Sequence, residues 1–424
     1  MKNILSINII GLFILLLGHS SCTDQFNKAG EAKKMTPLTI SVQPRMTETD
    51  DQTPIPNELT VKLENFSEGI SIEKEISYEP GKTLVVDSVI PGIYSITISG
   101  KAQDDNNDEY FFKGNKVNEP LVASSTIEID ISGLVAGKMK IIQMYYCGSK
   151  TLNNTNYFRD QFYEFYNNTE SETFYMDDIY IAYLYPTTAS STNSTVWPSE
   201  DGDQYVYAQQ IWKFPGNGTD YPLKAGESCV VAQFAANHRL ATYNPNSPVD
   251  CSSAEFEFNC NNANFPDQPA YDMVIVFYNG KKLYTMPQVL WSVFGPAIAI
   301  FKIPEGESYD PVNDLTMQTT DLGSTNRTLH AKVPRKWLLD VVETGANINS
   351  ITGKRVPAVL DAGLAYVGDT YVSLGIHRKV ESTRDNGDPI FMDTNNSTDD
   401  FDMGVTPVFR KYNTKMPSWN HTLK

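Results

Sequence analysis

Histidine is scarce in this chain, which contains five histidines in 424 residues. Beyond the N-terminal leader they stand far apart, at His238, His330, His377 and His421. The sequence has no H-E-x-x-H segment and no closely spaced pair, which argues against a histidine-based catalytic zinc site. It also lacks a G-x-S-x-G elbow, a P-loop and a G-x-G-x-x-G turn after a strand. We therefore expect no enzymatic activity.

Basic residues are outnumbered, because 34 Lys and Arg stand against 51 Asp and Glu, for a formal net charge of −17. A nucleic-acid partner is not expected, since neutralising phosphates needs a surplus of Lys and Arg on one face. Hydrophobic residues make up 41% of the chain, which is enough to bury real cores. The length is typical of about two to three domains.

A long apolar run occurs at the N-terminus, between Ile4 and Leu17 and just after Lys2. Ser6 and Asn8 interrupt the run, which is also too short to span a bilayer comfortably. A positive residue followed by an apolar stretch of this length is typical of a secretory signal peptide.

Small residues immediately precede Cys22, which predicts cleavage by lipoprotein signal peptidase and lipidation of that cysteine. His19 departs from the leucine that is usual three residues before such a cysteine. Residues 1–21 are then the signal peptide and 22–37 a polar tether, and loss of Lys2 changes the charge to 33 − 51 = −18. Each buried acyl CH₂ contributes about 0.8 kcal/mol, so the lipid bilayer is the expected partner of Cys22. We expect an outer-membrane lipoprotein that faces the cell surface.

Four further cysteines remain. Cys251 and Cys260 flank the segment S-S-A-E-F-E-F-N and are a possible disulfide in an oxidising envelope. Cys147 and Cys229 stand in strand-like runs, where a buried thiol and a disulfide both fit. Their pairing is left open.

Residues 38–137 contain short runs that alternate apolar and polar residues, such as L-T-V-K-L and Y-S-I-T-I. This period of two, with many β-branched residues, predicts half-buried strands. About seven strands in roughly 100 residues predict a small antiparallel β-sandwich. The acidic stretch 104–109 between two runs is expected to be a solvated hairpin loop, with cation binding as the alternative.

Residues 138–409 are predicted to form a larger β-sandwich, with strand candidates such as K-I-I-Q-M-Y-Y and M-V-I-V-F-Y. Stretches rich in Asn, Ser, Thr and Pro interrupt it at 186–203 and 243–269, and such insertions usually lie on the surface and carry specificity. Segment 334–343 fits either a helical turn or a strand. The predicted fold class is all-β, with two sandwiches and a short tail at 410–424.

Several segments resemble known families. V-I-P-G-I-Y-S-I-T-I-S-G resembles transthyretin-like and carboxypeptidase-regulatory-like sandwiches, and D-Q-F-Y-E-F-Y-N-N followed by Y-P-L-K-A-G-E-S-C-V-V-A resembles lamin-tail domains, which are immunoglobulin-like sandwiches. With W-L-L-D-V-V-E and I-H-R-K-V, the chain resembles a family of uncharacterised Bacteroidota lipoproteins over most of residues 38–409. The resemblance implies fold and location and no catalytic residues. Such lipoproteins are often encoded near TonB-dependent outer-membrane transporters, which implies a transporter partner and an accessory role in uptake.

Glu164 and Asn167 lie in the aromatic run F-Y-E-F-Y-N-N. A carboxylate on a strand between aromatic rings could act as a general acid with a raised pKa. The alternative that we favour, and that the lamin-tail resemblance supports, is structural. In it Glu164 accepts hydrogen bonds from an adjacent loop and Asn167 supports the turn after the strand.

The sharpest polar group is a run of oxygen-bearing side chains at Asp393, Asn395, Ser397, Asp399 and Asp400. Alternating Asp, Asn and Ser oxygens suit a Ca²⁺ ion, although the glycine and the final glutamate of an EF-hand are absent. Asx and Ser/Thr turns explain the same composition without metal. A hydrogen-bonded structural loop is the preferred interpretation, with a calcium site or a ligand-contacting loop as alternatives.

Aromatic residues in polar loops, notably Trp197 and Tyr243, could stack on sugars or contact a partner protein, while many other rings are expected in the cores. We expect a non-catalytic binding or accessory module whose ligand is a glycan or another extracellular compound. An adhesin or fimbrial-anchor subunit is the alternative, although the basic tail does not resemble a donor strand. A hydrolase is the third hypothesis and requires carboxylates that converge in one pocket.

Overall fold

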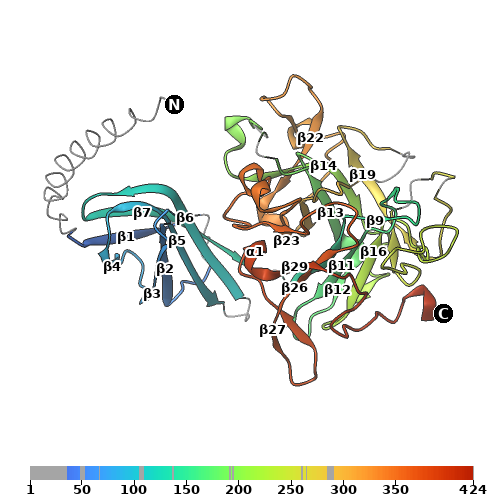
Figure 1. Cartoon of the computed structure of the whole chain (residues 1–424), viewed down its shortest axis with the longest axis horizontal. Helices are drawn as coiled ribbons and strands as arrows, with labels where there is room; N and C mark the ends of the chain where they lie inside the picture. Colours follow the sequence, from blue (N-terminus) through green and yellow to red (C-terminus); the bar gives the residue numbers. More distant parts are fainter. Residues whose placement is uncertain are drawn as a thin grey trace, which may run out of the picture. The chain divides into compact units, whose positions relative to one another are not determined.

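The computed structural model describes residues 36–47, 53–65, 67–104, 109–135, 138–190, 192, 195–258, 261–263, 265–283 and 291–423. Nearly all regular structure in these residues is β-strand (Figure 1), which confirms the predicted all-β class. Within them, no helix is long and apolar enough to cross a membrane.

The chain divides into two compact units. Unit 1 contains residues 55–100 and 114–131 together with the described residues up to Thr47, and unit 2 contains most of the remainder, including everything described from Ser132 onward. Each unit is described separately below.

Unit 1 is built on one seven-stranded sheet in the order β3-β2-β5-β6-β7-β1-β4. Its strands are β1 (Leu38–Thr47), β2 (Glu58–Asn65), β3 (Ile70–Ser77), β4 (Leu84–Val89), β5 (Gly92–Gln103), β6 (Glu109–Leu121) and β7 (Ser125–Val135). Alternate residues of β2 are buried, as period-two patterning requires. The two edge strands come together where Lys74 Nζ donates to the Val85 carbonyl at 2.9 Å, so the sheet wraps around one core.

Unit 2 is a sandwich of two seven-stranded sheets. The first has the order β18-β17-β16-β11-β8-β26-β29. Its strands are β8 (Met139–Tyr145), β11 (Phe162–Asn167), β16 (Ser228–Ala232), β17 (Phe256–Glu257), β18 (Tyr271–Asp272), β26 (Gly375–Arg378) and β29 (Phe401–Val405). The second has the order β21-β22-β14-β13-β20-β23, with β19 also paired to β14. Its strands are β13 (Ile179–Leu184), β14 (Tyr205–Lys213), β19 (Val274–Tyr278), β20 (Ile298–Lys302), β21 (Gln318–Thr320), β22 (Leu329–Pro334) and β23 (Leu338–Val342).

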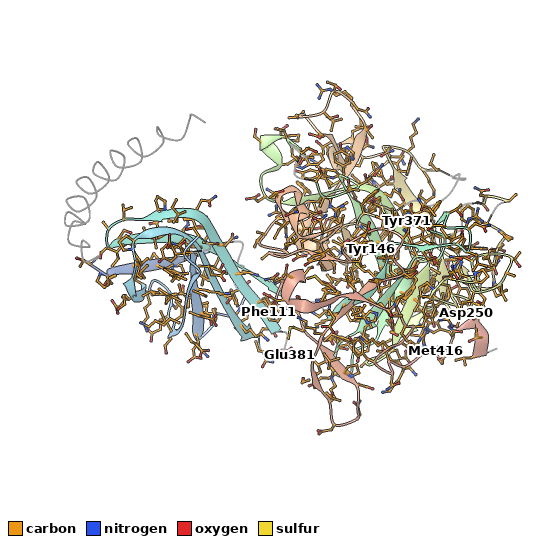
Figure 2. The ribbon with its side chains drawn as sticks, viewed as in Figure 1. Phe111, Tyr146, Asp250, Tyr371, Glu381 and Met416 are labelled. Carbon is orange, nitrogen blue, oxygen red and sulfur yellow. The ribbon has the colours of Figure 1, made fainter. Side chains whose placement is uncertain are left out.

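The main core lies between these two sheets, because buried side chains from both belong to one cluster. Phe165 of β11, Ile181 of β13 and Trp212 of β14 are among its members. Tyr146, just after β8, lies in the same core and donates a 3.2 Å hydrogen bond to the Gly345 carbonyl (Figure 2). β13 is buried on both faces, since its alternate residues join a second cluster behind the second sheet.

Short elements connect the sheets. Four two-stranded ribbons pair β9 (Ser149–Lys150) with β10 (Asn156–Tyr157), β12 (Phe174–Tyr175) with β15 (Pro222–Leu223), β24 (Thr344–Gly345) with β25 (Ala365–Tyr366), and β27 (Val380–Thr383) with β28 (Pro389–Phe391). The helical turns are η1 (Met176–Asp178), η2 (Ser199–Asp201), η3 (Leu315–Met317), η4 (Arg335–Trp337), η5 (Ile348–Gly353), α1 (Ser397–Asp400) and η6 (His421–Leu423). The undecided segment 334–343 begins as the turn η4 and continues as β23.

Candidate functional site

Glu164 lies in the middle of the first sheet of unit 2 and is completely buried. Its carboxylate accepts hydrogen bonds from Gln143 Nε2 at 2.9 Å, Ser228 Oγ at 2.7 Å, Thr414 Oγ1 at 3.1 Å and the Arg410 amide at 3.3 Å. Two of these donors belong to the C-terminal segment, which therefore crosses the sheet over Glu164. All four of these donors are protein groups, as a structural anchor requires.

Asn167 ends β11 and is also completely buried. Its side-chain amide donates to the carbonyls of Glu172 and Leu223 at 2.8 and 2.9 Å, and its oxygen accepts from the Thr169 amide at 3.1 Å. The side chain thus ties the turn after β11 to the neighbouring loop.

His377 extends this polar row, because it pairs across the sheet with Gln143, which in turn pairs with Glu164. The imidazole is 1% exposed, and neither ring nitrogen has a hydrogen-bond partner within the described part of the chain. Burial, reinforced by the Lys411 charge, lowers the pKa of His377 to about 3. It is therefore neutral at physiological pH.

The predicted oxygen-rich segment forms a tight turn that ends in α1, and its side chains point to different partners. Asp393 pairs with Lys140, the Asp399 carboxylate accepts from Asn396 Nδ2 at 2.5 Å, and Asp400 Oδ1 accepts from Thr394 Oγ1 at 2.7 Å.

Two further members of the segment are held locally. Ser397 Oγ donates to Asp361, and the Asn395 amide donates to Asp393 Oδ1 at 3.3 Å. Protein partners therefore already engage the side-chain oxygens of Asp393, Ser397, Asp399 and Asp400, which supports the structural interpretation of the loop. Calcium binding stays a prediction.

Arg378 neutralises the acidic groups gathered around this turn. Its guanidinium lies 2.7 Å from Asp340 and 3.6 Å from both Asp393 and Asp400, and its side chain is 2% exposed. Burial raises the pKa of Asp340 to about 6 despite this cation. At Asp393 the nearby Lys140 and Arg378 charges outweigh burial, so its pKa falls to about 2.

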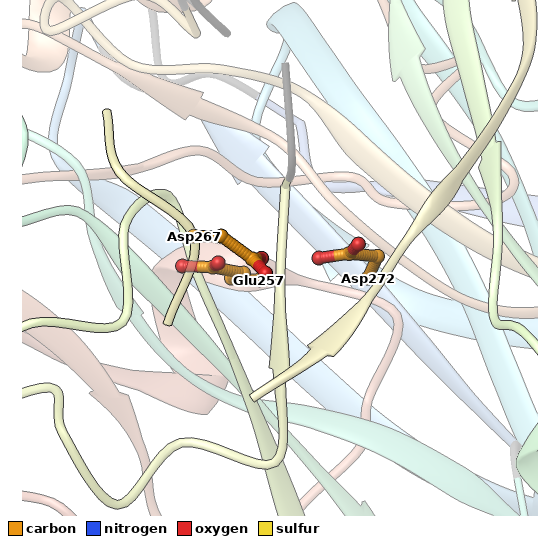
Figure 3. A group of neighbouring side chains, drawn as sticks. All are labelled: Glu257, Asp267 and Asp272. Carbon is orange, nitrogen blue, oxygen red and sulfur yellow. The ribbon is translucent and has the colours of Figure 1, made fainter. Parts of the chain in front are cut away.

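A second acidic group, not anticipated from the sequence, joins Glu257 of β17, Asp272 of β18 and Asp267 of a loop (Figure 3). One oxygen from each lies within 4.8 Å of the others. Burial, with weaker repulsion from Asp272 and Asp267, raises the pKa of Glu257 to about 7, although the amides of Ala235 and Gln268 donate to its carboxylate. The parallel pairing of two short strands creates this proximity, and no local sequence pattern records it.

Three cysteines of unit 2, Cys147, Cys229 and Cys251, lie among the described residues, where they are buried and form no disulfide with one another. Burial raises the pKa of Cys147 to about 11. Cys260 lies outside the described residues, so its predicted pairing with Cys251 stays a prediction, as does lipidation of Cys22, which lies outside them too.

A pocket of about 260 Å³ opens beside η2 and the start of β14 in unit 2. Its wall includes Trp197, whose ring stacks on Tyr207 with centroids 3.7 Å apart and planes 11° apart. Tyr205 lies two residues before Tyr207, on the same side of the strand. Sequence reasoning singled out Trp197, and the structure places it with two of the tyrosines from the aromatic-rich region.

Backbone hydrogen bonds hold the loop that carries Trp197. The Val196 amide donates to Asp321 Oδ1 at 2.9 Å, and the Leu322 amide donates to the Val196 carbonyl at 2.7 Å. Behind the pocket, His330 stacks on Tyr185 at 4.0 Å, and burial lowers the pKa of this histidine to about 4. The aromatic wall is therefore uncharged at neutral pH and fixed in place.

Two arginines supply the polar part of the pocket. Arg335 Nε donates to the Tyr205 carbonyl at 3.3 Å, and its Nη2 lies 3.4 Å from Asp203, a side chain that is 88% exposed. Arg355 is fully occupied, because it pairs with buried Glu343 at 2.6 Å and donates to three backbone carbonyls. Arg335 and Asp203 come from segments 132 residues apart, so sequence reasoning missed them.

Tyr243, the other loop aromatic that the sequence singled out, does not line this pocket. Its ring packs against Phe234 at 5.4 Å and His238 at 5.9 Å. It therefore takes part in local packing of its own loop.

Comparisons with known proteins place the chain in a family. A family model described as "Protein of unknown function (DUF4876)" matches residues 224–408. The crystal structure of a DUF4876 family protein from Bacteroides thetaiotaomicron VPI-5482 is 49% identical, with coverage of 91% of this chain and 100% of that chain and a TM-score of 0.67.

A second solved structure, described as a "putative cell adhesion protein" from Bacteroides eggerthii DSM 20697, is 11% identical over 64% of this chain and 76% of that one. Its TM-score of 0.17 carries no argument. None of the curated proteins matches the sequence. The identity and coverage of the Bacteroides thetaiotaomicron protein establish the relationship, and the chain belongs to the DUF4876 family.

Proposed function

We propose that the protein is a lipid-anchored, non-catalytic binding module of the outer membrane, displayed at the cell surface. The observation that carries the proposal is the Trp197 pocket, a preformed hollow that combines fixed aromatic rings with one ion pair whose acidic member is exposed. Concave sites with an apolar wall and a few fixed polar groups are typical of ligand binding.

The use of the buried acidic groups supports a binding role over hydrolysis. Glu164 accepts hydrogen bonds from the C-terminal segment, and the Asp177 carboxylate accepts from the amides of Gly218, Asp220 and Tyr221 at 2.9–3.2 Å. Carboxylates bound in this way hold loops in place. The pocket itself contains one acidic side chain, Asp203, whereas a glycosidase uses a facing pair.

The N-terminal leader supports lipid anchoring and an outer-membrane location. The apolar run that ends shortly before Cys22 suits export and lipidation, and residues 22–37 are polar enough to act as a tether. The segments quoted for the lamin-tail resemblance support a lamin-tail-like sandwich in unit 2. The family resemblance also supports a TonB-dependent transporter as the partner that receives the ligand.

Surface proteolysis of intact cells tests the proposal. The wild-type chain should sediment with membranes and be degraded by added protease, while a periplasmic marker protein stays intact. A Cys22→Ala variant should lose membrane attachment, because no acyl chain can be added. Protection of the wild-type chain until the outer membrane is broken would refute surface display.

A further inference from the structure

We propose that the Trp197 pocket binds one neutral pyranose ring of an extracellular glycan. The proposal rests on the proposed function, a surface binding module, and assigns the ligand class of its pocket. Its first support is size. The volume of about 260 Å³ lies just below the roughly 300–1,000 Å³ of sites for drug-sized ligands, so the pocket suits a single small ring.

The aromatic wall provides the second support. Tyr207 backs Trp197 at 3.7 Å, and Tyr207 Oη donates to the buried Asp201 at 3.2 Å, so both ring planes are fixed before a ligand arrives. The face of an aromatic ring is electronegative, and it attracts the C–H groups that line one side of a pyranose. A fixed platform also reduces the entropy lost on binding.

The polar edge provides the third support. Arg335 offers N–H donors held by the Tyr205 carbonyl, and Asp203 offers carboxylate oxygens beside them. Each sugar hydroxyl donates one hydrogen bond and accepts others, so two neighbouring hydroxyls can bridge the arginine and the carboxylate. The 3.4 Å contact between the two side chains is long, and Asp203 is largely exposed, so a ligand displaces little.

The charge balance of the pocket favours a neutral ligand. Arg335 is matched by Asp203, and Arg355 is matched by Glu343. An organic cation would suit an aromatic cage, but the Lys332 ammonium already lies 4.8 Å from the centre of the Tyr205 ring. An anionic ligand would find no unmatched cation among the lining side chains of the described pocket.

Titration of the full chain, purified in detergent, tests the inference. The probes are the neutral methyl pyranosides of glucose, galactose, mannose and N-acetylglucosamine, and a printed array of oligosaccharides built from them. Glucuronate, adenosine and choline are tested in the same way as an anionic, an aromatic and a cationic alternative ligand. Saturation-transfer NMR should show binding of at least one neutral pyranoside, with a Kd on the order of 1 mM for an isolated ring.

Variants assign the binding to this pocket. Asp203→Ala should weaken binding at least about tenfold, and because the side chain is 88% exposed the fold should be unaffected. Asp385→Ala, an exposed aspartate in the turn between β27 and β28, is the matched control and should bind as the wild type does. Trp197→Leu should abolish binding, with circular dichroism as the check on folding.

The outcomes separate the two proposals. If no neutral pyranoside or array glycan binds, if only adenosine, choline or glucuronate binds, or if Asp203→Ala and Trp197→Leu bind normally, the pyranose assignment of this pocket is wrong. These results leave surface display intact, because proteolysis of intact cells measures it independently. Chemical conversion of a bound sugar in the NMR spectra would instead refute a non-catalytic function.

Discussion

The buried charge cluster around Arg378 provides a severe test of how unit 2 is stabilised. Arg378→Met keeps much of the side-chain volume and removes the positive charge that faces Asp340, Asp393 and Asp400. It also removes donors to the carbonyls of Ile141 and Met392. Lys140 then still pairs with Asp393, whereas the buried Asp340 and Asp400 lose the ion pairs that Arg378 makes with them.

Removing one partner of a buried ion pair typically costs about 3–5 kcal/mol, because a charge is left uncompensated in a poorly polarisable interior. For a unit of roughly 300 residues, with an unfolding entropy of about 2.1 cal/mol/K per residue, that loss lowers the melting temperature by roughly 5–8 °C. All five tryptophans lie between Trp197 and Trp419, so their fluorescence reports the unfolding of unit 2 alone. Thermal and urea unfolding at pH 7.5, followed by this signal, measure the effect.

Two further variants identify the cause. Arg327→Met removes an exposed arginine and should leave the melting temperature unchanged. The double variant Arg378→Met/Asp340→Asn should recover part of the loss, since one uncompensated carboxylate disappears with the arginine. The reasoning fails if Arg378→Met melts within 2 °C of the wild type, or if the double variant is no more stable than the single one.

Three other predictions concern loops and pH. Glu164→Ala should cost about 2–4 kcal/mol and expose the C-terminal segment to limited proteolysis, because buried donors lose their acceptor; unchanged cleavage would contradict this role. The folded-state pKa of Glu257, about 7, exceeds its usual 4.5, so its contribution to stability is complete below about pH 4.5 and is lost as the pH rises through 7. Between pH 5 and 8 the free energy of unfolding of the wild type should therefore fall by up to about 3 kcal/mol more than that of Glu257→Gln, and parallel curves of this free energy against pH would refute the assignment. Gly353→Ala would place a β-carbon 1.8 Å from the Ser190 carbonyl oxygen, so a destabilisation of at least about 1–3 kcal/mol is expected in urea titrations, and a neutral result would show that this turn is not close-packed.

Local patterning predicted the strands well, because period-two alternation records which face of a sheet is buried. The run F-Y-E-F-Y-N became β11, with all six residues buried. Alternation could not show that both faces of this strand are buried. The face that carries Glu164 is covered by the C-terminal segment, which is distant in the sequence. The polar row that links Glu164 to His377 likewise depends on strand pairing across more than 200 residues.

The candidate sites were predictable to a smaller extent for the same reason. The turn at Asp393–Asp400 was visible as a cluster of oxygens, but its partner Lys140 lies 253 residues away in the sequence. Trp197 stood out as an aromatic residue in a polar loop, whereas Arg335 lies in an unremarkable P-R-K-W segment. Composition identifies individual side chains, and tertiary pairing decides which of them meet.

The structure of unit 2 offers a physical reason for the high content of acidic residues. Long loops have few backbone hydrogen bonds of their own, and buried amides without partners are costly. Here buried carboxylates supply the acceptors. Asp177 binds three amides of the loop after β14, and Glu343 binds the amides of Arg355 and Val356. Each charge-assisted bond contributes about 1.5–3 kcal/mol, so loops with little regular structure become rigid. A rigid loop around Arg355 in turn fixes one wall of the Trp197 pocket, which links the acidic composition to a preformed binding site.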